Sequence, residues 1–294
     1  MKNNSYIFAL LITMLGVVLM SVETLLIKLT NISGVTYSFY IGILMFISLN
    51  AVLLKDGFNN TLNLYKDNLK IILISGLLMG FANMFFINSV KHTTIANAVI
   101  IISSSPLFAT LFAYLFYKEK PQKNIFIATI FIFVGLLIIF SQQLSGGNLF
   151  GDILALLCAM SFSLNFVVMS KHTGVNRFAV LAFAGVCITV MSLFFIESYE
   201  VDTTSLYILL VAGLLVSPFS RIFVLIGTKT LPASEISLLT ILETILAPIW
   251  AFIFLNEIPV MNTIWGGLII LATLIINSLY IIKISKNKKI EESK

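Results

Sequence analysis

Residues 232–257, PASEISLLTILETILAPIWAFIFLNE, form an almost wholly apolar helix candidate with one acid, Glu243, in its middle. A polar stop at Asn256-Glu257, followed by Pro259, ends this stretch. Residues 94–121, TIANAVIIISSSPLFATLFAYLFYKEKP, end in the same way. When the two stretches are aligned on their terminal acids, five positions coincide: Glu119 with Glu257, Pro121 with Pro259, Ala113 with Ala251, Phe112 with Trp250 and Phe116 with Phe254. Self-similarity at this spacing predicts a chain built from two related halves.

The composition is that of an integral membrane protein. The chain is 59% hydrophobic and 11% charged, with a mean hydropathy of +1.04, whereas soluble domains carry about 25% charged residues. Its basic residues lie in short segments between apolar runs, so the net charge of +5 does not indicate nucleic-acid binding. The first apolar run is too long for a signal peptide and lacks a small-residue cleavage site, so we expect it to be a retained span.

A bilayer core requires about 20 apolar residues per helix. By this measure the sequence predicts an all-α integral membrane protein with ten transmembrane helices. The expected spans are roughly 6–27, 34–54, 70–90, 94–117, 124–141, 151–170, 177–197, 205–227, 233–255 and 261–282. We expect residues 1–146 to form the first five-helix repeat and 147–284 the second, followed by a basic, disordered cytoplasmic tail at 285–294.

The distribution of basic residues predicts the orientation. If the N-terminus is cytoplasmic, 15 of the 18 basic residues fall in cytoplasmic segments. The three exceptions are Lys28 and Lys91 in outside loops and Arg221 within a span. This asymmetry predicts that both termini are cytoplasmic. Because each half has an odd number of spans, the second half must cross in the opposite sense. The first helices of the halves also align, with Glu23 opposite Asn165. Inverted repeats of this kind are typical of secondary transporters, whose substrate site lies near the midplane.

The repeated phrase carries a family resemblance that covers the whole chain. It runs from Leu242-Glu243-Thr244-Ile245-Leu246-Ala247 to Asn256-Glu257, and its partner runs from Ser105-Pro106 to Lys118-Glu119. Together with two five-helix halves, it resembles the EamA-type members of the drug/metabolite transporter superfamily, which have a phrase of the type LEPxxAxxxxxxxxxE. The resemblance implies a central cavity walled by the first, third, fourth, sixth, eighth and ninth of the ten expected spans.

The chain departs from the family pattern at three places. Thr244 follows the central acid where the family often has proline, and Pro248 comes one turn later. Lys118-Glu119 and Asn256-Glu257 end the two helices where the family often has Gly-Glu. The first helix has Met20-Ser21-Val22-Glu23 where many members have a Trp-Gly phrase.

Three ionisable side chains lie within the expected spans, away from the ends: Glu23, Arg221 and Glu243. Intramembrane charge costs about 2.5–3.5 kcal/mol on insertion scales and usually has a partner in the protein interior. Arg221 and Glu243 differ in depth by roughly 6–8 Å at the rise of an α-helix, which two side chains can bridge. Glu23 lies roughly 15 Å from Arg221 in a core of about 30 Å. We therefore expect an Arg221–Glu243 pair, and we expect Glu23 to meet Lys28 or outside water.

We assign candidate roles on this basis, with no catalytic residue. The substrate-binding candidates are Arg221, Glu243, Asn165, Asn83, Phe81, Phe219 and Trp250, and the gating or proton-coupling candidates are Glu23 and Glu243. A structural alternative stays open, in which the Arg221–Glu243 pair only locks two helices together. The serines at 103–105 are expected to be helix-packing surface, and Cys158 and Cys187 to be buried hydrophobes. No Cys/His spacing suggests a metal, and no cofactor is expected.

The leading functional hypothesis is a secondary active transporter in the bacterial cytoplasmic membrane. It would export amino acids or related zwitterions by alternating access. An exporter of cationic drugs or amines is the alternative. A membrane-embedded enzyme acting on lipid-linked substrates is more distant, because the sequence offers no nucleophile or acid–histidine cluster at one depth. A non-transporting scaffold or receptor subunit is also a distant hypothesis, because such a protein would usually carry a sizeable extramembrane domain and none is expected here. The expected partners are a small-molecule substrate and the lipid bilayer, with no nucleic acid, and homodimerisation is left open.

Overall fold

The computed structural model describes residues 2–118, 123–143, 149–172, 174–227 and 233–291. These ranges contain helices and no strand. The helices are α1 (Lys2–Leu29), α2 (Gly34–Leu53), η1 (Leu54–Asp56), α3 (Phe58–Asp67), α4 (Leu69–His92), α5 (Ile95–Ile102), α6 (Ser105–Tyr117), α7 (Lys123–Gln143), α8 (Leu149–Lys171), α9 (Arg177–Leu193), α10 (Thr203–Val211), η2 (Ala212–Val216), α11 (Ser217–Gly227), α12 (Ala233–Leu255) and α13 (Met261–Glu291).

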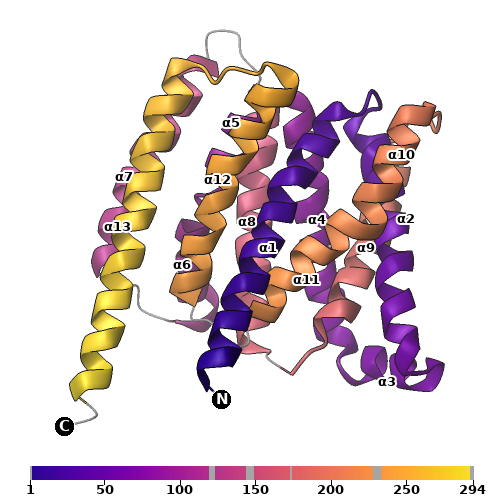
Figure 1. Ribbon diagram of the computed structural model, residues 1–294, viewed down its shortest axis with the longest axis horizontal. Coiled ribbons are helices and arrows are strands. Elements are labelled where there is room, and N and C mark those ends of the chain that lie inside the picture. The colour runs from indigo at the N-terminus through magenta and orange to yellow at the C-terminus, as the bar shows by residue number, and fades with distance from the viewer. Residues whose placement is uncertain (1, 119–122, 144–148, 173, 228–232, 292–294) are drawn as a thin grey trace.

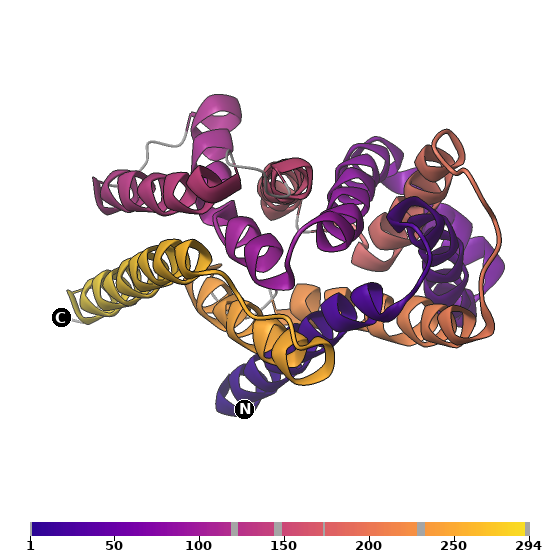
Figure 2. The same cartoon turned by 90° about the horizontal axis from the view of Figure 1, so that it is seen from above.

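The long helices run between two opposite faces of the molecule, and α1 begins at the face where α13 ends (Figure 1). Seen from above, α7 and α13 lie at one end of the bundle and α2, α9 and α10 at the other (Figure 2). Within the described ranges, six helical segments are long and apolar enough to cross a membrane, and four more apolar helices are shorter. The six are 6–29, 34–53, 69–92, 95–117, 149–169 and 203–227, and the four are 130–139, 177–193, 242–255 and 261–277.

Two expected spans are interrupted in the middle. The span expected at 94–117 is split into α5 and α6 by Ser103 and Ser104. Both serine hydroxyls donate to carbonyls one turn earlier, Ser103 Oγ to Ile100 O and Ser104 Oγ to Ile101 O, each at 2.6 Å. The serines therefore satisfy backbone groups at a helix break, which is how broken helices are tolerated in membranes. The span expected at 205–227 contains the π-helix η2, a feature often found at functional sites.

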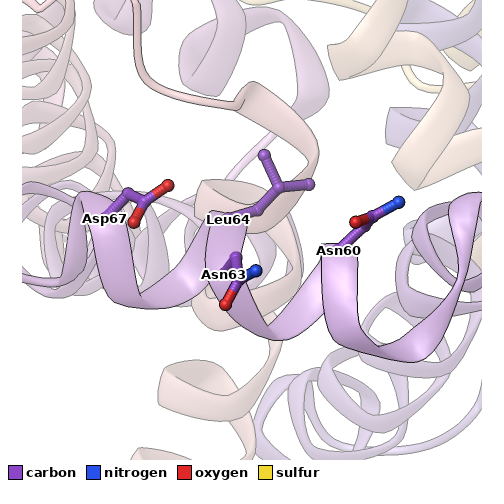
Figure 3. A pocket seen from close by; sticks show the side chains of 4 residues that line it. All are labelled: Asn60, Asn63, Leu64 and Asp67. Atoms are coloured by element: carbon purple, nitrogen blue, oxygen red, sulfur yellow. The ribbon is translucent and has the colours of Figure 1, made fainter.

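The segments expected to be irregular are partly helical. The basic segment 55–70 contains α3, whose Thr61 hydroxyl donates to Leu53 O at 2.9 Å and so attaches α3 to the end of α2. The expectation of a disordered tail at 285–294 was wrong for its described part, because α13 continues to Glu291. An open hollow on α3 is lined by Asn60, Asn63, Leu64 and Asp67 (Figure 3). It lies on a helix that holds none of the candidate site residues.

The packing of the helices repeats between the two halves of the chain. α1 packs against α11 and α12, and its counterpart α8 packs against α4 and against α5 and α6. α2 packs along its own counterpart α9, and α7 packs along its counterpart α13. When each helix is exchanged for its counterpart, these packing pairs map onto one another. The two halves are therefore related by an approximate two-fold arrangement.

The two repeated helices end with the same backbone geometry. Within the described ranges, only Lys118 (φ 57°) and Asn256 (φ 53°) have positive φ among the non-glycine residues. Each follows the last residue of its helix, α6 or α12, and directly precedes an acid of the repeated phrase. Helices commonly end on a residue in the left-handed region, usually Gly and sometimes Asn. The aligned phrases thus encode one shared helix stop.

Replacing Lys118 by glycine is expected to stabilise the folded protein by roughly 0.5–1 kcal/mol. The left-handed conformation strains a lysine by roughly 1–2 kcal/mol, and glycine relieves this strain at some entropic cost in the unfolded chain. Asn256→Gly should change stability less, because asparagine tolerates this conformation. Unfolding of both variants in detergent micelles measures the difference. Destabilisation by Lys118→Gly would show that this helix end does not carry the strain.

Candidate functional site

A buried ion pair joins α1 to α11, which cross near the centre of the bundle (Figure 1). Arg221 Nη1 lies 2.6 Å from Glu23 Oε2, and the two side chains are 9% and 1% exposed. The Ser217 hydroxyl donates a short hydrogen bond to the other oxygen, Glu23 Oε1. Arg221 Nη1 also donates to Ser217 O at 3.0 Å. Both charges are therefore enclosed and hydrogen-bonded, as a buried pair requires.

The expected Arg221–Glu243 pair was wrong, and so was the expected contact of Glu23 with Lys28 or outside water. Side chains tilt toward the N-terminus of their own helix. α11 runs antiparallel to α1, since Gly16 lies against Ser220 while Glu23 lies against Ser217. Arg221 is one turn after Ser217 and tilts back toward it, so its guanidinium converges on Glu23.

Glu243 tilts away from Arg221 because α12 runs parallel to α1. This direction follows from two contacts, Leu239 with Ala9 near the start of both helices and Trp250 with Ser21 further along. Trp250 Nε1 donates to the Ser21 hydroxyl at 3.2 Å. The sequence gives the depth of each residue in the bilayer, but it does not give the direction in which the side chain tilts relative to a neighbouring helix.

Glu243 nevertheless faces the interior. It lies one turn before Ala247 and two turns before Ala251, which are 1% and 2% exposed and belong to the main core cluster. Its carboxylate interacts electrostatically with Glu23 and Arg221, and also with Cys158 of α8. The side chain of Glu243 is itself partly exposed. The structure thus gathers Glu23, Arg221 and Glu243 in one region between α1, α8, α11 and α12.

The contact of α1 with α11 is a polar crossing, that is, a place where polar side chains join two crossing helices. A second polar crossing, between α8 and α4, occupies the equivalent place in the other half. Asn165 Nδ2 of α8 donates to Ser75 O at 2.7 Å and to Ser75 Oγ at 2.6 Å on α4. The alignment that sets Glu23 on Asn165 also sets Ser217 on Ser75. The position of Arg221 corresponds to Met79. The repeat has therefore kept one crossing charged and the other neutral.

The remaining candidates lie in other environments. Asn83, 4% exposed, donates to Met79 O of its own helix at 2.8 Å. Phe81 is 41% exposed and stacks on Phe85 at 5.9 Å between ring centroids. Phe219 packs against Phe223 at 5.8 Å. Substrate binding by these residues, and by Asn165 and Trp250, stays a prediction. Cys158 and Cys187 are buried and free, as expected.

Two lysines form a clasp between the C-terminal ends of α1 and α4. Lys28 Nζ donates to Val90 O at 2.8 Å and to Thr93 O at 2.5 Å. In return, Lys91 Nζ donates to Thr30 O at 2.6 Å and to the Thr30 hydroxyl at 2.7 Å. Cations are favourable at the negative ends of helix dipoles. We call this pair the lysine clasp; the sequence showed both lysines near helix ends but not that each caps the other's helix.

A buried acid that was not among the expected site residues, Asp152, lies in the first turn of α8. It is 0% exposed and accepts a hydrogen bond from the Thr93 hydroxyl at 2.6 Å. Nearby, Glu257 of the repeated phrase accepts from Ile95 N at 2.6 Å, at the start of α5. An acid at a helix start is favoured by the dipole. The burial of Asp152 was not visible in a sequence that places it at the edge of a span.

The comparisons with known proteins agree with this architecture. A family model described as the EamA-like transporter family matches residues 7–141 and 149–279. An uncharacterized transporter of Archaeoglobus fulgidus is 27% identical over 220 residues, 73% of this chain and 69% of that protein. An S-adenosylmethionine uptake transporter of Rickettsia felis is 24% identical over 249 residues, 82% of this chain and 83% of that protein. One crystal structure, 16% identical, gives a TM-score of 0.63 over 92% of this chain and 97% of that chain, which supports the fold alone.

Proposed function

Since this chain belongs to the EamA-like transporter family, we propose that it is a secondary active transporter that moves a small metabolite across the bacterial cytoplasmic membrane by alternating access. It would have ten spans in two inverted halves, 1–146 and 147–284, with both termini and the tail at 285–294 in the cytoplasm. The matched regions of the family model, 7–141 and 149–279, support this division. The names of the family and of the relatives point to transport and not to catalysis.

The observation that carries the proposal is the pair of equivalent polar crossings. The charged crossing lies six residues before the end of α1, and the neutral crossing lies six residues before the end of α8. Because counterparts in inverted halves run in opposite directions, the two crossings lie toward opposite faces. Rocking of one half against the other could then loosen one crossing while the other holds, as alternating access requires.

In the described part of the chain, the helix contacts at one face of the bundle have no equivalent at the opposite face. This difference supports a transporter conformation in which the substrate pathway is closed at one face only. The lysine clasp joins α1 to α4, whereas their counterparts α8 and α11 have no comparable packing contact in the described ranges. α12 packs along α5, while α6 packs on α8 and α7. The face with the clasp would be the outside in the proposed orientation. We therefore propose that this conformation is closed to the outside.

Export is the direction implied by the family resemblance, and the relative named as an uptake transporter makes import the competing direction. The expectation of amino acids or zwitterions depended on an Arg221–Glu243 pair, which the geometry replaces with Arg221–Glu23. Export of cationic drugs or amines was the alternative.

Counterflow in proteoliposomes tests the proposal. The full chain would be reconstituted, loaded with unlabelled solute and supplied with the labelled form of the same solute. Amino acids, amines and S-adenosylmethionine serve as probes. We expect saturable exchange above that of empty liposomes for one class, retained in Glu200→Gln, which alters an exposed acid, and reduced in Glu23→Gln. Folded protein that exchanges none of the probes, in either membrane orientation, would contradict transport of small metabolites.

A further inference from the structure

The apolar helical segment 203–227 changes from α-helix to π-helix just before the charged crossing. The N–H of Ser217 donates to the carbonyl of Ala212, five residues earlier, as in a π-helix. Pro218 follows directly and is buried. A proline inside a helix has no N–H, and its ring clashes with the carbonyl four residues earlier, which here is Leu214 O. The π-turn therefore lies where proline disrupts the α-helical hydrogen bonds.

A side chain from the first half of the chain supplies a donor to this carbonyl. The Ser48 hydroxyl of α2 donates to Leu214 O at 2.8 Å. In an α-helix, this carbonyl would accept from the N–H of residue 218, which proline lacks. Hydroxyl groups of neighbouring helices commonly replace hydrogen bonds that are lost at prolines in membranes. Ser48 therefore compensates for Pro218.

The contact of α2 with η2 is close. A Cβ at Gly213 would lie 2.6 Å from Leu44 Cβ and 3.3 Å from Ile41 Cδ1, both on α2. Leu44 and Ser48 are four residues apart in α2, so they lie on the same side of that helix. Gly213 and Leu214 thus meet one face of α2 at adjacent turns. The bend is therefore held by α2 and not by η2 alone.

The bend decides which residues of α11 face α1. A π-turn adds about one residue to a helical turn, and each residue of an α-helix turns by about 100°. The residues after η2 are therefore rotated by about 100° from where an unbroken α-helix would place them. Ser217 and Arg221, which follow η2 directly and one turn later, are the residues that bond Glu23. Loss of the π-turn would rotate both away from the acid.

The counterpart of this segment in the first half has no such bend. The alignment of the halves sets Pro218 on Gly76. α4 runs as one α-helix (Leu69–His92), and its crossing is the neutral one, in which Ser75 accepts from Asn165. The bend thus accompanies only the charged crossing.

We propose that Ser48 is a positioning residue for the charged crossing. Its hydroxyl holds the bend that Pro218 introduces, and the bend aims Arg221 at Glu23. The Ser48–Leu214 contact and the charged crossing both join the first half of the chain to the second, so rocking of the halves would strain them together. That last step rests on the proposed function, and it deepens this function by naming a residue of α2 through which the halves are coupled.

Thermal unfolding of the purified full chain in detergent tests whether Ser48 compensates for Pro218. Ser48→Ala is expected to lower the midpoint by roughly 2–4 °C, the shift that loss of one hydrogen bond of typical net strength produces. Ser48→Thr keeps a hydroxyl and should unfold near the midpoint of the unmodified protein. In Pro218→Ala, residue 218 gains an N–H for Leu214 O, so adding Ser48→Ala should then change the midpoint little.

A second comparison tests the positioning role. The variant Glu23→Met, Arg221→Met lacks the ion pair, so Ser48→Ala in this background costs only its own hydrogen bond. Its shift should therefore be smaller there than in the unmodified protein, where Arg221 also loses its aim. A purely structural serine would produce the same shift in both backgrounds. Ser38→Ala is the matched control, because this α2 hydroxyl donates to Gly34 O of its own helix, and its shift should be the same in every background.

Two results would overturn the inference. One is an equal loss from Ser48→Ala with proline and with alanine at position 218; the other is an equal loss with and without the ion pair. The two comparisons use different backgrounds, so either one decides if the other variant does not fold. Neither depends on transport. Absence of counterflow for every solute class would instead refute the transport function and leave the unfolding results in place, so the two failures can be told apart.

Discussion

Replacing Arg221 by methionine is expected to destabilise the folded protein by about 3–5 kcal/mol, the usual cost of removing one partner of a buried ion pair. Methionine keeps an unbranched apolar side chain but removes the charge, so Glu23 would stay buried with only the Ser217 hydroxyl as a partner. Denaturant unfolding in mixed micelles measures this loss. Lys66→Met, which alters an exposed lysine of α3, is the matched control and should change stability little.

The double variant Glu23→Met, Arg221→Met decides whether the pair is a coupled unit. Well-packed apolar residues often replace a buried ion pair at little cost, so the double variant should be considerably more stable than Arg221→Met alone. Additive losses from the two single changes would contradict direct coupling. Restored stability without restored counterflow would show that the pair does more than lock α1 to α11.

Replacing Gly42 by valine is expected to destabilise the protein by about 3 kcal/mol or more, at the upper end of the usual overpacking range. A Cβ at Gly42 would lie 2.6 Å from Gly185 O and would also clash with the Thr189 side chain of α9. A Cβ at Gly185 would lie 2.6 Å from Gly42 O. Backbone atoms cannot rotate away, so α2 and α9 would have to separate along their contact. Close approach through small residues is a main source of helix association in membranes.

Gly174→Ala is the control for this prediction, because no atom lies within 4 Å of the Cβ it would add. Thermal unfolding of both variants in the same detergent provides the comparison. If Gly42→Val were as stable as Gly174→Ala, the close α2–α9 contact would not contribute to stability. The same packing recurs between α7 and α13, where a Cβ at Gly266 would lie 2.6 Å from Gly135 O. The α2–α9 and α7–α13 contacts thus each bring together a glycine from both helices.

The sequence by itself determined the class of protein, the repeat and most helix boundaries. The expected span 34–54 became α2 (Gly34–Leu53), and the expected span 233–255 became α12 (Ala233–Leu255). These features are local: apolar length sets a helix in a bilayer, and the aligned acids Glu119 and Glu257 reveal the repeat. The three charges that matter, Glu23, Arg221 and Glu243, were also visible, because charge is rare in an apolar span.

Only the tertiary structure decided which of these charges meet. Helix depth can be counted along a sequence, but the direction of a side chain depends on which way its helix runs beside a neighbour. Depth counted along the sequence placed Arg221 near Glu243 and far from Glu23, whereas the antiparallel contact of α1 with α11 pairs Arg221 with Glu23. The same contact leaves Glu243 without a partner among the described residues. The lysine clasp and the burial of Asp152 likewise depend on segments far apart in the chain, and no local pattern records such contacts.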